Sequence, residues 1–195
     1  FLPPPEWRHY LVIDPGWQCT AGLWAAVDPD GTIWVYSEYY QKEKHPVYHM
    51  AALHDQWTLF GRPKATVLMD PAGFNPIRNF SGHPWPSWEE EFSYAAHQLE
   101  AAWCKPRGAD NGDKTCLRVK RYLSCRKLFF AEHLKNWELE WAQFLWPDPG
   151  SAAYRRDPDE PQGVRHLCDC FVAGTLVLTD RGQEPIETLT AGRMV

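Results

Sequence analysis

The sequence has no run of apolar residues near the roughly 20 that a membrane-spanning helix requires. It also lacks a basic, apolar leader at its start, so no secretory signal is predicted. No phosphate-binding loop of the form G-x-x-x-x-G-K-[ST] occurs, which excludes a P-loop ATPase motif from this chain. These absences predict a domain that has no membrane partner and does not hydrolyse ATP in a P-loop.

Paired C-x-x-C motifs are also missing among the six cysteines, and we expect reduced thiols. A zinc site built from His166, Cys168 and Cys170 with a distant Cys116 or Cys125 is an alternative. Cys-x-Cys spacing suits tetrahedral zinc poorly compared with C-x-x-C, so this alternative is disfavoured.

The sequence has no excess of basic residues, and its net charge is −5. This charge argues against a protein that binds DNA by electrostatic attraction alone. The charge is uneven, however: residues 105–127 carry eight basic side chains and two acidic ones. We expect part of this segment to contact a phosphate backbone without reading bases, and the alternative is a solvated loop and helix face. The candidate DNA-binding residues are Arg118, Lys120, Arg121, Arg126 and Lys127.

The composition, with 44% hydrophobic residues, is typical of a globular domain. Residues 1–7 are rich in proline and lack an initiator Met, so we expect a linker there. Strands predicted at 10–14, 21–27 and 32–40 suggest a three-stranded antiparallel meander. Further predicted elements are a helix at 45–60, a strand at 65–69, helices at 89–103 and 124–137, strands at 117–122 and 140–146, and a helix at 160–168. This order predicts an α/β domain with a mixed sheet and flanking helices.

Acidic residues stand at the ends of two of these predicted strands. Asp14 and Asp70 each directly follow an apolar strand, and Asp169 lies in the final predicted helix. Three converging carboxylates would raise one another's pKa values, and Mg²⁺ or Mn²⁺ would relieve that repulsion. Two such ions activate water and stabilise a leaving oxygen in phosphodiester hydrolysis. An Asp before Pro is also an ordinary turn residue, and Glu38 is either a fourth acid or, as we prefer, solvent-facing.

The order of these motifs resembles the nuclease domain of phage large terminases. The resemblance covers residues 8–169 and rests on the motifs at 14–16, 36–40, 67–72, 117–119 and 163–169. It implies a ribonuclease-H-like fold and two-metal cleavage of double-stranded DNA during genome packaging in the host cytoplasm. It also implies three partners: the terminase ATPase domain, the small terminase subunit and the portal.

By this resemblance, Asp14, Asp70 and Asp169 match the family's metal-binding acids. His166, one helical turn before Asp169, would orient the site or the attacking water, or would lie on the helix surface. Two alternatives stay open. One is another ribonuclease-H-like nuclease of the resolvase or transposase type. The other is a non-catalytic module that stacks single-stranded nucleic acid on its Trp and Tyr side chains.

The segment 170–195 has a different character. It begins with Cys170 and continues with a Gly-Thr step, a predicted β-hairpin and a Pro-Ile-Glu motif, which together resemble the first block of inteins and Hint domains. The Cys170 thiol would attack the carbonyl carbon of Asp169 in an N-to-S acyl shift. The later His and terminal Asn of that family are not in the sequence. We therefore expect a C-terminal intein half as partner, or a truncated reading frame; alternatively, 171–195 extends the nuclease with a hairpin.

Overall fold

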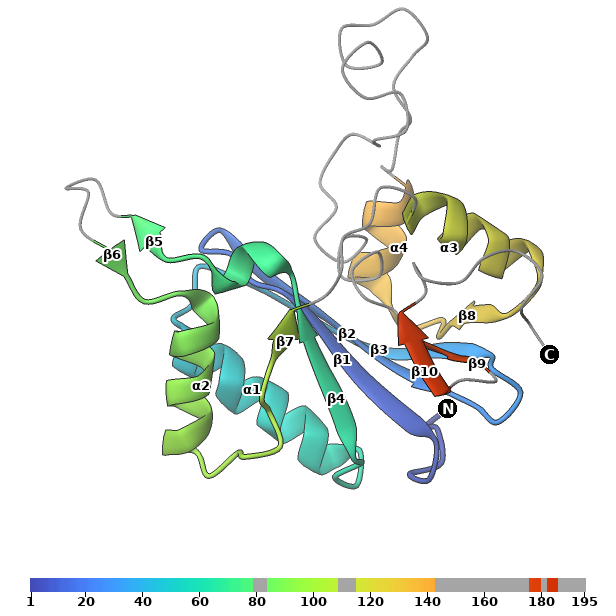
Figure 1. The fold of residues 1–195 in the computed structure, drawn as a ribbon, viewed down its shortest axis with the longest axis horizontal. Helices are drawn as coiled ribbons and strands as arrows, with labels where there is room; N and C mark the ends of the chain where they lie inside the picture. The colour runs from blue at the N-terminus through green and yellow to red at the C-terminus, as the bar shows by residue number, and fades with distance from the viewer. Residues whose placement is uncertain (79–83, 109–114, 143–175, 180–181, 186–195) are drawn as a thin grey trace, which may run out of the picture.

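A computed structural model describes residues 1–78, 84–108, 115–142, 176–179 and 182–185. Its centre is a six-stranded sheet with the strand order β7-β4-β1-β2-β3-β8 (Figure 1). The strands of this sheet are β1 (Arg8–Asp14), β2 (Cys19–Val27), β3 (Ile33–Lys42), β4 (Ala65–Met69), β7 (Arg107–Gly108) and β8 (Leu128–Phe130). The helices are α1 (Pro46–Leu59), α2 (Trp88–Gln98), α3 (Thr115–Ser124) and α4 (Lys135–Ala142), with a short 3₁₀ helix η1 (Pro71–Phe74).

The first three strands form the predicted antiparallel meander. β1 pairs with β2, and β2 pairs with β3. The turn between β2 and β3 is closed by Asp28, whose Oδ1 accepts hydrogen bonds from the backbone N–H groups of Asp30 at 3.0 Å and Thr32 at 2.8 Å. Gly31 in this turn has a φ of 74°, a conformation that glycine adopts without a steric cost.

The other strands make the sheet mixed. β4 runs parallel to β1, β7 parallel to β4, and β8 parallel to β3. Only β2 is reversed in this sheet, so the other five strands end at the same edge, which we call the carboxyl edge. The predicted fold class, a mixed sheet with flanking helices, is confirmed.

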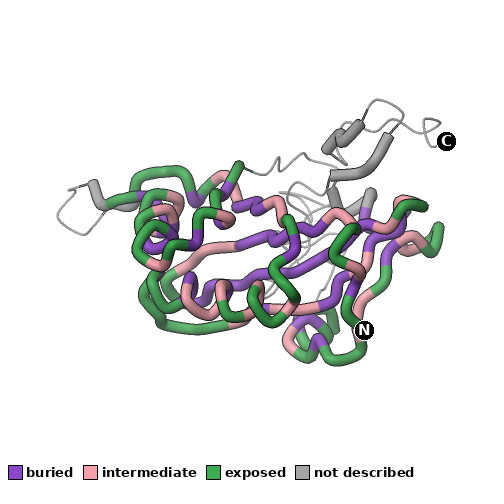
Figure 2. Tube along the Cα trace, turned by 90° about the horizontal axis from the view of Figure 1, so that it is seen from below, coloured by how far each residue is buried: buried purple, intermediate pink, exposed green. Residues whose placement is uncertain are grey.

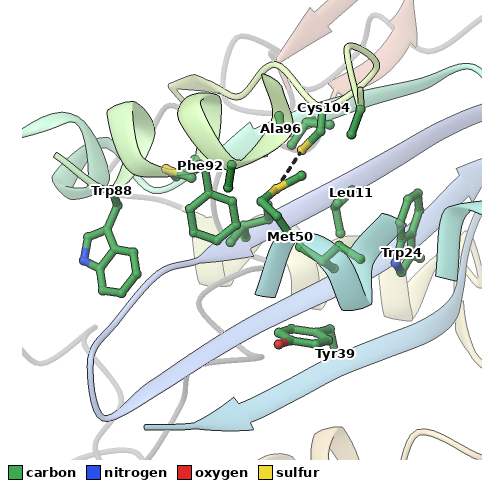
Figure 3. Packing of buried hydrophobic residues seen from close by; sticks show 14 of the residues in the cluster. Leu11, Trp24, Tyr39, Met50, Trp88, Phe92, Ala96 and Cys104 are labelled. Carbon is green, nitrogen blue, oxygen red and sulfur yellow. Dashed lines mark hydrogen bonds between the residues drawn. The ribbon is translucent and has the colours of Figure 1, made fainter. Parts of the chain in front are cut away.

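Helices cover both faces of the sheet. On one face, α1 and α2 pack over the sheet around Met50 and Phe92, which are fully buried against strand residues such as Leu11 and Trp24 (Figure 3). On the other face, called here the α4 face, Val119 and Tyr122 of α3 and Trp137 of α4 pack on β1, β2 and β3. β2 is therefore buried along its whole length, as expected for an inner strand covered on both sides. Figure 2 shows the buried positions concentrated along the strands, with exposed positions on the outer sides of the helices.

The helix α2 has a complete N-terminal cap. The Ser87 hydroxyl accepts a hydrogen bond from the backbone N–H of Glu90, and the Glu90 carboxylate accepts one from the backbone N–H of Ser87. This capping box satisfies two helix-end donors at once, and it fixes where α2 begins. No helix in the described ranges is long and apolar enough to cross a membrane.

Three predicted elements in the later part of the chain are wrong. Residues 117–122, predicted as a strand, lie in the helix α3. The helix predicted at 124–137 is instead the strand β8 followed by the start of α4, and the strand predicted at 140–146 begins inside α4. The helix predicted at 160–168 lies outside the described residues.

Two short hairpins form separate two-stranded sheets beside the central sheet. β5 (Ile77–Arg78) pairs with β6 (Pro84–Trp85) between η1 and α2. Near the C-terminus, β9 (Leu176–Thr179) pairs antiparallel with β10 (Gly182–Pro185). The short C-terminal hairpin predicted from the sequence is therefore present.

Candidate functional site

The two strand-end aspartates lie side by side at the carboxyl edge. In the parallel pairing of β1 with β4, Ile13 is level with Met69, so the next residues, Asp14 and Asp70, are neighbours. The backbone N–H of Asp70 donates to the carbonyl oxygen of Ile13 at 3.1 Å, which extends the ladder to this point. Both aspartates are half-buried. The structure thus brings together two of the three predicted metal-binding acids.

Both carboxylates belong to the α4 face of the sheet. Side chains alternate between the two faces of a strand. Val12 and Leu68, two residues before Asp14 and Asp70, pack in the cluster under α3 and α4. The antiparallel register places Ala21 beside Asp14 and Tyr40 beside Ala21. One row across the carboxyl edge therefore reads Asp70, Asp14, Ala21 and Tyr40.

Each aspartate is followed by a tight turn that contains proline and glycine. Asp70 caps η1, because its Oδ1 accepts a hydrogen bond from the backbone N–H of Ala72 at 2.7 Å. A Cβ on Gly73 would lie 2.8 Å from Sδ of Met69 and 3.0 Å from Cγ of Pro15. The turn after Asp70 therefore lies directly against the turn after Asp14, with no room for a larger residue at position 73.

The turn after Asp14 is held by a polar contact of its own. The Thr20 hydroxyl donates to the carbonyl oxygen of Gly16 at 3.1 Å. A Cβ on Gly16 would lie 2.7 Å from the carbonyl oxygen of Cys19, so only glycine fits without a backbone shift. The ring of Trp17 packs on Trp88 of α2 with 4.8 Å between centroids, which ties this loop to the start of that helix.

A buried polar group adjoins this row, and the sequence did not reveal it. Glu140 of α4 is only 5% exposed. The Tyr40 side chain is hydrogen-bonded to Cys19 and to Glu140, and burial followed by these contacts raises the pKa of Tyr40. Burial is also the largest cause that raises the pKa of Cys19, to which the nearby charges of Glu140 and Asp14 add. Periodicity could have found Glu140 only if residues 135–142 had been predicted as a helix.

Glu38 does not face the solvent, because it is half-buried against the start of α4. Its Oε1 accepts hydrogen bonds from the backbone N–H and the side-chain amide of Asn136, both at 2.9 Å, and its Oε2 accepts one from the backbone N–H of Trp137 at 2.9 Å. These donors lie in the first turn of α4, where a carboxylate is favoured by the free N–H groups and the helix dipole. The preferred expectation, a solvent-facing Glu38, is wrong: this residue caps α4.

The predicted basic residues lie in α3 and the turn that follows it. Arg118, Lys120 and Arg121 belong to α3, and Arg121 and Arg126 are exposed. Lys127 precedes β8, and its Nζ donates to the carbonyl oxygen of Asp30 at 2.9 Å.

This turn is far from the aspartates along the sheet. Leu128, the residue after Lys127, is level with Ile33 at the start of β3, whereas Tyr40 is level with the aspartates. Seven residues of strand at about 3.3 Å each separate these positions by about 20 Å. A contact of Arg126 or Lys127 with DNA stays a prediction, and it would lie far from Asp14 along the strand direction.

The remaining predicted site residues, Asp169, His166 and the intein nucleophile Cys170, lie outside the described residues. Within the ranges that the structure describes, no group of three or more His, Cys, Asp and Glu side chains is placed to hold a metal ion. Asp14 and Asp70 nevertheless supply adjacent carboxylate oxygens on one face of the sheet, the ligand type that Mg²⁺ and Mn²⁺ prefer. The two residues fit such an ion as part of its ligand set.

Comparison with solved structures relates this architecture to known proteins. The large terminase from the thermophilic bacteriophage D6E overlays with a TM-score of 0.62 at 16% identity, over 88% of this chain and 40% of that one. The g2p large-terminase nuclease domain of bacteriophage SPP1, a crystal structure with bound Mn, overlays with a TM-score of 0.55 at 14% identity, over 85% of this chain and 83% of that one. The chain has a ribonuclease-H-like fold.

The same comparisons also limit the likeness. The ribonuclease-H-like chain spans about 40% of the length of the D6E large terminase. The yeast mitochondrial Holliday junction resolvase Ydc2 overlays with a TM-score of 0.40 at 11% identity, over 68% of this chain and 69% of that one. No protein-family model and no curated protein sequence matches the chain.

Proposed function

We propose that this domain is a metal-dependent endonuclease that cleaves double-stranded DNA, in the manner of a phage large-terminase nuclease. The observation that supports this best is the pair Asp14 and Asp70, which lie on adjacent parallel strands at the carboxyl edge. The pair occurs in a fold that overlays two large terminases, one of them with bound Mn. Asp169 is proposed as the third acid and His166 as a residue that orients the attacking water.

Mg²⁺ or Mn²⁺, bound as two ions, would supply an activated water and charge stabilisation for the leaving oxygen. The chain's own contribution is to hold the carboxylates in place before substrate arrives. Asp70 is fixed by its backbone bond to Ile13 and its side-chain bond to the Ala72 N–H. Asp14 is the last residue of β1, and the ladder to Ala21 fixes its backbone. The backbone at both aspartates is therefore fixed before a cation binds, which favours catalysis by preorganisation.

The direct test is a supercoiled-plasmid assay on the full chain with Mn²⁺, with Mg²⁺ and with EDTA. We expect nicking and linearisation that depend on the divalent ion. The variants Asp14→Asn and Asp70→Asn keep the shape of each side chain and remove its charge, so we expect both to lose at least a hundredfold in cleavage rate while they stay folded.

A matched control is Asp30→Asn. Asp30 is an exposed aspartate in the turn between β2 and β3, at the opposite end of the sheet from the carboxyl edge. It should cleave at the unaltered rate. Full cleavage by Asp70→Asn, or cleavage that persists in EDTA, would overturn the assignment of a metal-dependent site to these aspartates.

As a terminase nuclease, the domain would act in the host cytoplasm with an ATPase domain, a small terminase subunit and a portal. Such a setting predicts cleavage with little base preference, because backbone contacts position DNA without reading its sequence. Mapping of the cut sites on a plasmid by sequencing the ends tests this point. A single preferred junction structure, cut in place of linear duplex, would instead favour a resolvase-type enzyme.

We further propose that Cys170 begins an intein or Hint segment, as the motifs in 170–195 suggest. The hairpin of β9 and β10 lies where that resemblance expects one. An N-to-S acyl shift at Cys170 would place a thioester between Asp169 and the Cys170 sulfur, and an added thiol would exchange with it and release residues 1–169. Dithiothreitol should therefore yield this fragment from the unaltered chain and not from Cys170→Ala. Cleavage of DNA should be the same in both proteins, and an equal yield of fragment from both would refute the proposal.

A further inference from the structure

Two basic side chains at the carboxyl edge stand on either side of the paired aspartates. Arg107 lies on β7, level with Leu68 of the neighbouring β4. Lys42 is the last residue of β3, level with Cys19 of β2. Across the sheet the order is therefore Arg107, Asp70, Asp14 and Lys42, with one strand between Asp14 and Lys42.

Both basic residues are on the same face of the sheet as the aspartates. Leu68 packs in the cluster of the α4 face, and residues level with each other on paired strands share a face, so Arg107 belongs there. Ala21 packs in the same cluster, and Cys19 lies two residues before it on β2, so Lys42 belongs there as well. The charge of Lys42 lowers and that of Asp14 raises the pKa of Cys19, which places this thiol within electrostatic reach of both.

Neither cation is bound by another residue of the described ranges. Both side chains are exposed. Among the described residues, the structure shows no hydrogen bond or ion pair for the guanidinium of Arg107 or the ammonium of Lys42. An exposed guanidinium or ammonium group is able to form charge-assisted hydrogen bonds with phosphate oxygens.

We propose that Arg107 and Lys42 form a two-point clamp that holds the sugar-phosphate backbone of DNA across the carboxyl edge, with Asp14 and Asp70 between them. This inference rests on the proposed function and adds the direction in which the substrate lies. The backbone crosses the strands of the sheet and runs from β7 towards β3.

The spacing of the clamp suits nucleic acid. Four strand spacings of about 4.8 Å separate β7 from β3, and Lys42 lies about four residues, or about 13 Å, further along the strand direction than Arg107, which gives about 23 Å between the two backbones. Each DNA strand carries one phosphate per roughly 3.4 Å of helix axis, so the two cations would contact phosphates about seven nucleotides apart. The phosphate to be cut would lie between these two contacts, beside the aspartates. Because both contacts are to phosphates, the clamp recognises no base sequence.

The test measures binding and not cleavage, so it does not depend on nuclease activity. The full chain with Asp70→Asn, in EDTA, binds a fluorescein-labelled duplex of 20 base pairs while anisotropy is recorded between 50 and 200 mM KCl. In this background we compare Arg107→Ala, Lys42→Ala and the double variant. Each single variant should bind about tenfold more weakly at low salt. Each should also reduce the slope of log affinity against log salt by about 0.9, and the double variant by about 1.8.

The matched control is Lys64→Ala. Lys64 is exposed and immediately precedes β4, at the end of that strand away from Asp70. We expect its affinity and salt slope to equal those of the parent protein, and Arg107→Lys should restore the slope that Arg107→Ala loses.

Three outcomes would overturn the clamp. If the parent binds DNA and both alanine variants keep its slope, the two residues do not contact phosphate. If Lys64→Ala lowers the slope as much as they do, binding is spread over the surface. A parent protein that binds no duplex at any salt concentration would refute the proposed function as well, so the two failures are distinguishable.

Discussion

Asp70 donates its backbone N–H to the carbonyl oxygen of Ile13 at 3.1 Å, so the ladder that joins β4 to β1 continues up to the carboxylates. The separation between the side chains of Asp14 and Asp70 is therefore set by the backbone of the sheet and not by their own rotamers alone. A site built on strand ends is held more precisely than a site on loops, which is what a metal-assisted reaction requires.

The contact of Gly73 with Pro15 predicts a sensitive position behind this pair. Gly73→Ala would place a methyl group 2.8 Å from the Met69 sulfur and 3.0 Å from Cγ of Pro15, so the Met69 side chain must shift and the ring of Pro15 in the turn after Asp14 must give way slightly. We expect a loss of about 1–3 kcal/mol in the free energy of unfolding, as for other overpacked sites. The cleavage rate per folded molecule should fall at least tenfold. Urea unfolding and the plasmid assay measure these two effects.

Gly108→Ala is the control for that variant, because its new methyl group would meet Phe74 only at 3.8 Å, an ordinary contact. It should resemble the unaltered protein in both assays. An unimpaired cleavage rate in Gly73→Ala would show that the spacing of the two turns does not matter for the reaction.

Glu38 gives a prediction that separates stability from activity. Glu38→Ala removes the acceptor for three hydrogen bonds at the start of α4, and we expect a loss of about 1–2 kcal/mol in unfolding free energy. Glu38→Gln keeps one oxygen acceptor and should lose less. Well below the unfolding midpoint, both variants should cleave DNA at the unaltered rate, as measured by nicking kinetics beside a thermal melt. A stable Glu38→Gln variant that cannot cleave would instead place Glu38 in the site.

Two buried histidines predict how stability depends on pH. Burial lowers the pKa of His9, which is hydrogen-bonded to Tyr36 and to the Pro4 carbonyl, and of His49, which is hydrogen-bonded to Tyr39. The unfolded chain therefore takes up these protons first, near the ordinary pKa of 6.5. Their contribution to stability is complete above about pH 6.5 and is lost as the pH falls through the lowered folded values.

Urea unfolding between pH 7.5 and 5 measures this loss. His9→Gln should make the free energy of unfolding depend less steeply on pH, because only His49 of the two buried histidines then remains to take up a proton on unfolding. The exposed His133 provides the control, since His133→Gln should leave the curve unchanged. An identical slope in His9→Gln and the unaltered protein would contradict the assignment.

The part of the fold that carries the aspartates was predictable from local pattern. Strands β1 and β4 are short apolar runs that end in Asp-Pro, and the meander has strong turn residues at Asp28–Gly31. Each aspartate directly follows its strand. The placement of Asp14 and Asp70 at an edge of the sheet could therefore be inferred before the register was known.

The prediction of the later elements was wrong because tertiary contacts decide their structure. In α3, Val119 and Tyr122 are three residues apart and both buried, yet Leu117 and Val119 also alternate, so a short window fits a strand equally well. β8 is only three residues long and exists because it pairs with β3. Misplacing this strand hid α4, and with α4 the roles of Glu38 and Glu140.

The two ends of the sheet differ in how well their turns tolerate substitution. At the carboxyl edge the turns after Asp14 and Asp70 are each constrained by a neighbour, as Gly16 and Gly73 show. At the other end, Pro29 and Asp30 of the β2–β3 turn are exposed, and the turn is closed by its own Asp28. The β2–β3 turn is thus a suitable place to attach a dye or a tether for watching the domain on DNA, because it lies at least about 26 Å from the aspartates along the strands.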